Sequence, residues 1–385
     1  MSVMSLRLVL ILLAILIAVC LSLFSSVIFI KLVQAKQEKK RKADTKIIKP
    51  ILNKLLSAET VDFYKNHMLG ISKLEAKLKG KGSLQTLEDV LLDIIENSDS
   101  ETKVKARIIA YNFGFPEKCV SMIVDPFTGN IALGCRKAGL YQYDVAIPGI
   151  LKALEIHSSN TQYQALMALA RIGDTISMVQ AFNKINRLIY VNERAINEIL
   201  NIFSGDRYVL YKEMIHHQSN YLVRLFLKSM NAETANKLIR DIIAISVSGD
   251  KETRLAAIIA ISKSGSSGKS STLIKALGDK EWEIRAMAAK TLGVLTDPGA
   301  VYPLAKAARD REWWVRQNAV TSLLAYPDSG EILVSIAKAK DRYAYESMLY
   351  ALGKAGETGL LSRIREVWTE NSNHGNLLKE KIIQN

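Results

Sequence analysis

The sequence predicts an all-α protein, in which a solenoid of stacked helical hairpins is preceded by one N-terminal transmembrane helix. Three observations predict this fold. Residues 8–30 contain no charged side chain. A pattern of aspartate and arginine recurs in the C-terminal half at a spacing of 31 residues. Within each copy, apolar residues recur three and four positions apart, which is helical spacing.

The N-terminal run from Leu8 to Ile30 has 23 residues. As an α-helix rising about 1.5 Å per residue it is roughly 34 Å long, enough for a hydrocarbon core of about 30 Å. A cleaved signal peptide is the alternative, but its apolar stretch usually has about 7 to 15 residues and ends at a small-x-small site, which we do not find. A lipoprotein site at Cys20 is disfavoured, because the apolar run continues for ten more residues. We therefore expect residues 1–30 to remain as a membrane anchor.

A basic segment follows the anchor. Residues 31–49 hold eight Lys or Arg against two acids, whereas Arg7 alone precedes the apolar run. Because flanks rich in Lys and Arg stay in the cytoplasm, we expect an inner-membrane protein with its N-terminus outside and its body cytoplasmic. The basic residues either serve this topology alone or also attract anionic headgroups, by about 1 kcal/mol each near the surface. We interpret residues 31–82 as a basic helical linker.

The net charge of +14 is concentrated at this end of the chain. Residues 1–54 carry +8, which leaves +6 for all the others. A groove that binds nucleic acid would give steep salt dependence and needs dense Lys and Arg along the body. Nucleic-acid binding therefore stays a disfavoured alternative.

The repeat has six polar positions that recur in step: Arg254, Asp279, Arg285, Asp310, Arg316 and Asp341. The three arginines are each 31 residues apart. In each copy a short apolar helix is expected before an Ala-rich second helix, and the aspartate stands at the turn between them, where it can accept N–H bonds. We expect these positions to form a ladder of charge-assisted hydrogen bonds between stacked repeats.

Weaker copies of the pattern extend the predicted solenoid to residues 83–370, with residues 371–385 as a C-terminal tail. Residues 115–143 interrupt it, since Pro116, Pro126 and Gly129 mark turns. We interpret this stretch as an irregular insertion, which is either a degenerate repeat or a binding feature.

The pattern of Asp, an apolar residue with Arg, and Ala-rich periodicity ending in Leu-Gly resembles the HEAT-like repeats of the phycobilisome-lyase type. Together with the apolar N-terminus and the segment NERAINEILNIFSGD at 192–206, it is similar to bacterial membrane-anchored HEAT-repeat proteins. That resemblance implies a scaffold whose partner is a membrane glycosyltransferase or a polysaccharide assembly system. A bilin-lyase-like enzyme is the alternative that the repeat family implies.

Chemistry-bearing motifs are absent from the sequence. The segment Gly265-SSGKSS lacks the first glycine of a phosphate-binding loop, because Lys263 occupies that position. None of the five histidines precedes a glutamate, the pair that binds iron in hydroxylases built on HEAT repeats. The three cysteines include no C-x-x-C pair. We therefore expect no enzyme activity, no cofactor and no metal.

Five aromatic residues cluster at the starts of successive second helices: Trp282, Trp313, Trp314, Tyr343 and Tyr345. Aromatic side chains with arginine nearby are typical anchors of protein interfaces. Trp282 and Trp313 are 31 residues apart, so packing between repeats is the alternative for them, whereas the position that corresponds to Trp314 in the preceding repeat is Glu283. The sequence thus predicts a membrane-anchored cytoplasmic scaffold that binds a membrane-associated protein through these residues.

Overall fold

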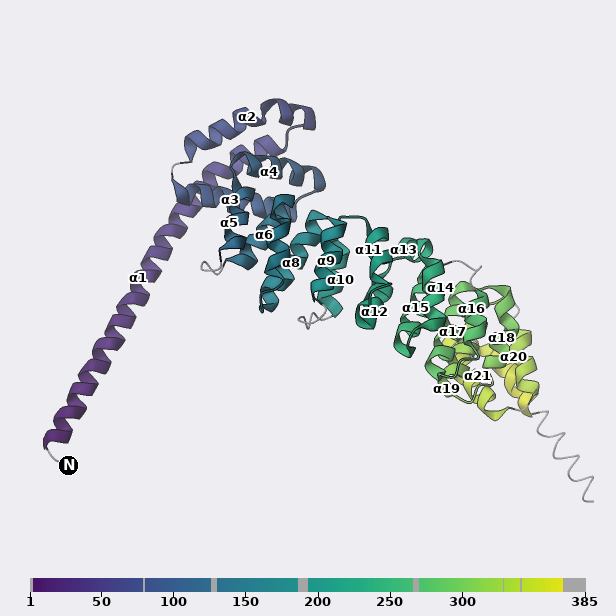
Figure 1. Cartoon of the computed structure of the whole chain (residues 1–385). Coiled ribbons are helices and arrows are strands. Elements are labelled where there is room, and N and C mark those ends of the chain that lie inside the picture. Colours follow the sequence, from purple (N-terminus) through teal and green to yellow (C-terminus); the bar gives the residue numbers. More distant parts are fainter. Residues whose placement is uncertain are drawn as a thin grey trace, which may run out of the picture. The chain divides into compact units, whose positions relative to one another are not determined.

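The computed structural model describes residues 3–78, 80–125, 130–185, 193–265, 270–327, 329–339 and 341–369. These residues form helices and short connections, with no β-strand among them (Figure 1). The predicted all-α solenoid is confirmed. The chain divides into two compact units, residues 1–172 and residues 173–385, which are described separately below.

The helices of the first unit follow one another in this order: α1 (Val3–Leu56), α2 (Thr60–Lys77), α3 (Lys81–Asn97), α4 (Ser100–Asn112), α5 (Phe115–Val124), α6 (Ile131–Tyr141), the short 3₁₀ helix η1 (Asp144–Ala146), α7 (Ile147–Ala153) and α8 (Ser159–Ile172). Short connections force consecutive helices to turn back on each other. As a result α3 packs on α4, α5 on α6, and α7 on α8.

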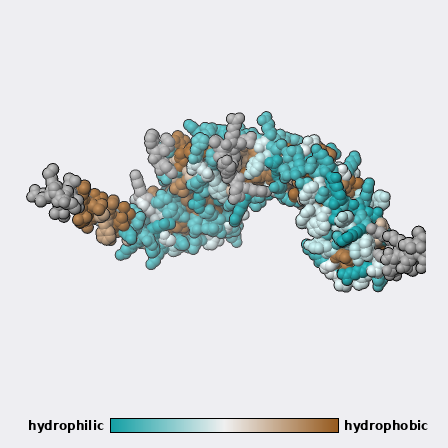
Figure 2. Space-filling model, turned by 90° about the horizontal axis from the view of Figure 1, so that it is seen from below, coloured by the Kyte–Doolittle hydropathy of each residue, from teal (hydrophilic) through white to brown (hydrophobic). Residues whose placement is uncertain are grey.

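Helix α1 is continuous over 54 residues, about 81 Å at the usual helical rise. Every side chain from residue 16 to residue 43 is exposed, and Figure 2 shows the apolar part as a hydrophobic rod. Farther along, Ile48 and Leu52 are fully buried where α1 packs on α2 and α3. The apolar part and the part packed in the body therefore belong to one helix, which contains Pro50 near its end.

Residues 115–143, which we interpreted as an irregular insertion, are helical over most of their described length. They fold into α5 and α6, which pack on each other, while residues 126–129 lie outside the described residues. Pro116 occupies the first turn of α5, where its missing N–H costs nothing because that donor has no helical partner anyway. A proline that starts a helix was thus interpreted as one that breaks it.

Glycine sets the close approach of α6 to α8. A Cβ atom on Gly139 would lie 2.5 Å from the Cα atom of Ala168, far inside contact distance. The two backbones can approach this closely only because neither residue carries a large side chain.

The second unit contains α9 (Thr175–Ile185), α10 (Glu193–Ile202), α11 (Arg207–Met214), α12 (Asn220–Ser229), α13 (Ala232–Lys237), α14 (Ile239–Ser248), α15 (Lys251–Lys263), α16 (Ser270–Ala276), α17 (Trp282–Leu295), the 3₁₀ helix η3 (Pro298–Ala300), α18 (Val301–Ala307), α19 (Trp313–Leu323), α20 (Ser329–Lys338) and α21 (Arg342–Ala355). Residues 358–369 form one more helical segment.

The C-terminal repeats are helical hairpins stacked in chain order. The first helices α14, α16, α18 and α20 pack on the second helices α15, α17, α19 and α21, and each second helix packs on the next (Figure 1). On α17 the buried apolar residues include Ile284, Ala288 and Leu292, which lie on one face. Each hairpin covers the apolar side of its neighbour, so the stability of the stack comes from contacts between adjacent repeats.

Candidate protein-binding surface

The polar repeat positions join successive hairpins. Arg285 of α17 is almost fully buried, and its Nε and Nη2 donate to the two carboxylate oxygens of Asp310 at 2.7 and 2.9 Å. Its Nη1 donates to the backbone carbonyl of Asp279 at 2.9 Å. Two-point binding of a carboxylate by arginine is among the stronger hydrogen-bonding arrangements. One side chain therefore ties its own turn to the turn of the next repeat.

The same arrangement occurs in the preceding repeats. Arg254 donates to Asp279, and Arg224 lies 3.5 Å from Asp250. Sequence analysis did not include Arg224, although its position 30 residues before Arg254 was a signal for it. We call these arginine–aspartate pairs the ladder.

The ladder ends differently at α21. This helix begins one residue after Asp341, whose carboxylate accepts the N–H groups of Tyr343 and Ala344 at 3.0 and 3.1 Å. Arg316 instead donates through Nε to the hydroxyl of Ser347 at 3.2 Å. Its guanidinium carbon lies 5.3 Å from the centre of the Tyr343 ring. A hydroxyl and an aromatic ring thus take the place of the carboxylate that we expected Arg316 to meet.

The ladder carboxylates are held in their ionised form. Burial would raise the pKa of Asp310, but hydrogen bonds from Arg285 and from the backbone N–H of Glu312, with the charge of Arg285, outweigh it and hold the pKa below its ordinary value of 3.8. Hydrogen bonds likewise outweigh burial and lower the pKa of Asp279. These groups hold the repeats in register.

Three aromatic rings lie together on the second helices. Trp313 and Trp314 start α19 with ring centroids 4.6 Å apart and planes at 79°, and the Tyr350 ring of α21 lies 5.7 Å from that of Trp313. The exposed fractions are 38% for Trp313, 55% for Trp314 and 52% for Tyr350. The rings support one another and still leave a large apolar area open to a partner.

Two further residues of the predicted set, one on α17 and one on α21, are also exposed. Trp282 starts α17, and Tyr343 lies in the first turn of α21. Tyr350 was missed in the sequence, but it follows Tyr343 by seven residues, which places both on one side of the helix. We define the aromatic surface by these five residues: Trp282, Trp313, Trp314, Tyr343 and Tyr350.

The structure does not bring Tyr345 to this surface. Its ring stacks on Trp368, with centroids 4.1 Å apart and planes at 11°. Trp368 belongs to the helical segment 358–369. Tyr345, which we expected to bind a partner, packs instead on the last described helix.

The aromatic surface has the residue types that are common in protein-binding surfaces. Tryptophan and tyrosine offer a large contact area with few rotatable bonds, so little conformational entropy is lost when a partner orders them. Arginine and aspartate of the ladder fix the helices that carry the rings. The arrangement can present a large apolar contact area to another protein.

A buried lysine joins α1 to the body of the first unit. Lys105 of α4 donates from Nζ to the carbonyl oxygens of Ala58 at 2.6 Å and Leu56 at 3.3 Å, just where α1 ends. The same ammonium forms an ion pair with Glu101 at 2.7 Å. The last carbonyls of a helix lack backbone partners and carry partial negative charge, so a cation there stabilises the helix end. Among the described helices, α1 is the one long and apolar enough to cross a membrane, judged by length and composition alone.

Other reactive groups of the described residues are placed for structure. Burial raises the pKa of the Cys119 and Cys135 thiols to about 12, which makes both poor nucleophiles at neutral pH. No three His, Cys, Asp or Glu side chains among the described residues gather where they could hold a metal ion. Most of the Gly265-SSGKSS segment, residues 266–269, lies outside the described residues.

Comparison with known proteins agrees with this architecture. Residues 239–325, from the start of α14 to just beyond α19, match the family model for HEAT repeats. Residues 239–325 are therefore HEAT-like repeats. A search of curated proteins finds no match.

Several solved structures are similar to this chain at low identity. Human deoxyhypusine hydroxylase in complex with glycerol is 18% identical, covers 71% of this chain and 97% of its own, and has a TM-score of 0.28. The CpcE–CpcF complex of phycocyanin lyase from Nostoc sp. PCC7120 is 14% identical over 66% of this chain and 94% of its own, with a TM-score of 0.26. An engineered protein is 15% identical over 87% and 95%, with a TM-score of 0.28. Because these TM-scores are so low, we draw no conclusion from these likenesses.

Proposed function

We propose that this HEAT-like repeat protein is a membrane-anchored scaffold that binds another protein through the aromatic surface. The observation that supports the anchor best is the exposure of every described apolar side chain in the first half of α1, on a helix whose end is buried in the body. Exposed leucine, isoleucine and phenylalanine in an unbroken run are costly in water and favourable in lipid.

The proposed orientation places the N-terminus outside and the body in the cytoplasm of a bacterial inner membrane. Lysine and arginine of residues 31–49 support it. Confinement to the bilayer raises the effective concentration of a membrane partner, so modest affinity would suffice. The resemblance to anchored HEAT-repeat proteins favours a membrane glycosyltransferase or a polysaccharide assembly system as that partner.

Site-specific crosslinking tests the proposal. A photoreactive amino acid at Trp314 of the full chain, activated in intact membranes, should capture a membrane protein. The same amino acid at Tyr345, which stacks on Trp368, serves as the control and should capture much less.

A second variant tests whether Trp314 contributes binding energy. Because the Trp314 ring is 55% exposed, Trp314→Ala should weaken co-purification of the captured protein about tenfold or more and leave the thermal unfolding midpoint within about 2 °C. A large loss of stability would show that Trp314 belongs to the core. Equal capture from positions 314 and 345 would refute the aromatic surface as the binding site.

A further inference from the structure

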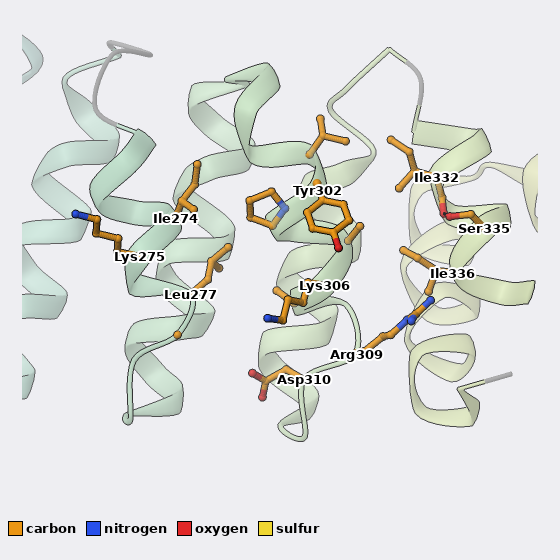
Figure 3. Close-up of a pocket in the computed structure, with 15 residues that line it drawn as sticks. Ile274, Lys275, Leu277, Tyr302, Lys306, Arg309, Asp310, Ile332, Ser335 and Ile336 are labelled. Carbon is orange, nitrogen blue, oxygen red and sulfur yellow. Dashed lines mark hydrogen bonds between the residues drawn. The ribbon is translucent and has the colours of Figure 1, made fainter. Parts of the chain in front are cut away.

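A groove crosses the first helices of three successive C-terminal repeats. Residues of α16, α18 and α20 line it, and it has a volume of about 890 Å³ (Figure 3). Its apolar lining includes Ile274 and Leu277 from one repeat and Ile332 and Ile336 from another. Tyr302 of α18 stands between these walls and is 81% exposed.

The charged residues of this groove are unbalanced. Three cations line it, Lys275, Lys306 and Arg309, and none of them forms an ion pair with a described residue. The acid in the lining, Asp310, has both carboxylate oxygens occupied by Arg285. The groove is therefore apolar at its walls and positive at its edge.

The cations lie where they could meet the edge of a bound chain. In Figure 3 the Arg309 side chain extends toward α20 beside Ile336, and Lys306 lies on the same helix as Tyr302. An acidic side chain of a ligand could pair with either cation while its apolar neighbours cover the isoleucines. Tyrosine adds contact area and a hydroxyl at low entropic cost.

We propose that this groove binds a peptide segment of another protein that combines aliphatic or aromatic residues with aspartate or glutamate. Burial of the apolar side chains would supply affinity, and pairing with Lys306 and Arg309 would select acidic over basic segments. Nucleic acid fits the groove less well, because its lining offers one aromatic ring for stacking and many aliphatic side chains.

This site shares no residue with the aromatic surface. The groove belongs to first helices and the aromatic surface to second helices. An experiment can therefore refute the proposal for one site and leave the proposal for the other unaffected.

Peptide selection on the full chain tests the proposal. The protein is held in phosphatidylcholine nanodiscs, which carry no net charge, and is exposed to a synthetic library of twelve-residue peptides built from Leu, Phe, Ser, Glu and Lys. We expect the enriched peptides to contain Leu or Phe together with Glu. Tyr302→Ala, and separately the pair Lys306→Glu and Arg309→Glu, should each weaken binding of those peptides about tenfold.

A matched control makes the same charge change outside the groove. Lys280→Glu together with Lys290→Glu alters two exposed residues that do not line the groove, and it should leave peptide affinity unchanged. If the double charge reversal lowers the thermal midpoint, Lys306→Gln with Arg309→Gln replaces it. Enrichment of lysine-rich peptides, no enrichment, or equal affinity of the groove variants and the parent protein would overturn the proposal. Oligonucleotide binding that the same variants abolish, without peptide binding, would also overturn it.

Discussion

Arg285 shows how much one residue can organise in a repeat protein. Its guanidinium contacts the turn of its own hairpin and the carboxylate of the next, so it acts at two levels of the stack. A single truncation there removes a contact within one repeat and a contact between two repeats. The stability of a solenoid depends on contacts between adjacent repeats. Substitution of a ladder residue should therefore lower the free energy of unfolding more than substitution of other polar residues.

Two aspartates at equivalent sequence positions should therefore differ in their contribution to stability. Asp310→Ala leaves the buried Arg285 guanidinium without its carboxylate, and we expect it to lower the free energy of unfolding by about 2 to 3 kcal/mol. Asp341→Ala removes a helix cap and should cost about 1 kcal/mol. Urea midpoints of the two variants measure the difference. Equal losses would show that the ladder adds nothing beyond capping.

The ladder also predicts that the folded protein loses stability at low pH. The pKa of Asp310 is lowered in the folded protein, so its contribution to stability is present above the unfolded pKa of about 3.8 and is lost as the pH falls through the lower folded value. We expect the thermal midpoint to drop below about pH 3.8, and Asp310→Asn to flatten that drop. Midpoints measured at several pH values between about 2 and 6 test this. An unchanged pH profile in Asp310→Asn would assign the acid sensitivity to other groups.

Residue partners could be predicted from the sequence only where local structure repeats faithfully. Asp279 and Asp310 stand three residues before α17 and α19 begin, but Asp341 stands one residue before α21. This shift of a helix start leaves the spacing to the previous arginine unchanged, so periodicity could not reveal it. The stacking of Tyr345 on Trp368 was equally hidden, since it joins helices that no repeat pattern relates.

At the scale of helices, apolar periodicity predicted the C-terminal helices correctly, whereas the prolines did not predict where helices start and end. The hairpins from α14 to α21 follow the predicted pattern of a short first helix and an Ala-rich second helix. The pair α5 and α6 was missed because Pro116 starts a helix, and the sequence does not say which side of a proline is helical. Small residues permit close packing of helices, as Gly139 of α6 does against Ala168 of α8.

Two glycines within helices should respond to substitution in opposite directions. Gly139→Val would place atoms against the Ala168 backbone, and overpacking of this kind should cost about 1 to 3 kcal/mol. Gly353→Ala in α21 meets nothing within 4 Å and should stabilise by about 0.5 to 1 kcal/mol, because alanine loses less backbone entropy than glycine. Urea unfolding followed by circular dichroism distinguishes them. A neutral Gly139→Val would mean that α6 and α8 can move apart without loss.

For the molecule as a whole, the continuity of α1 links anchoring to the folded body. Since Lys105 and the buried Ile48 and Leu52 fix the end of α1, the helix that we place in the membrane is part of the first unit. No flexible linker intervenes among the described residues of α1. If α1 spans a membrane as we propose, a binding partner would meet a first unit that is joined to its anchor by a continuous helix.

The basic stretch of α1 provides a test of orientation that leaves the fold intact. Seven lysines of this stretch are exposed, and the six that we change are Lys31, Lys36, Lys39, Lys42, Lys46 and Lys49. Changing these six to glutamine removes most of the positive charge near the apolar run and keeps Lys40 and Arg41. The Arg41 guanidinium lies 3.4 Å from the Asp89 carboxylate of α3. The positive-inside rule counts basic residues within about 15 to 20 positions of a membrane helix, so a substantial fraction of the chains should insert in reverse.

Protease digestion of inside-out vesicles measures that fraction. The parent body should be digested, because its cytoplasmic side faces the medium, whereas reversed chains of the six-fold variant should be protected. The matched control changes four exposed lysines far from the anchor to glutamine, Lys275, Lys280, Lys290 and Lys306, and should be digested like the parent. Far-ultraviolet circular dichroism should be the same for all three proteins, since none of these lysines is buried. Protection of the parent body would mean that the scaffold faces the opposite side of the membrane, and full digestion of the six-fold variant would mean that charge next to α1 does not set its direction.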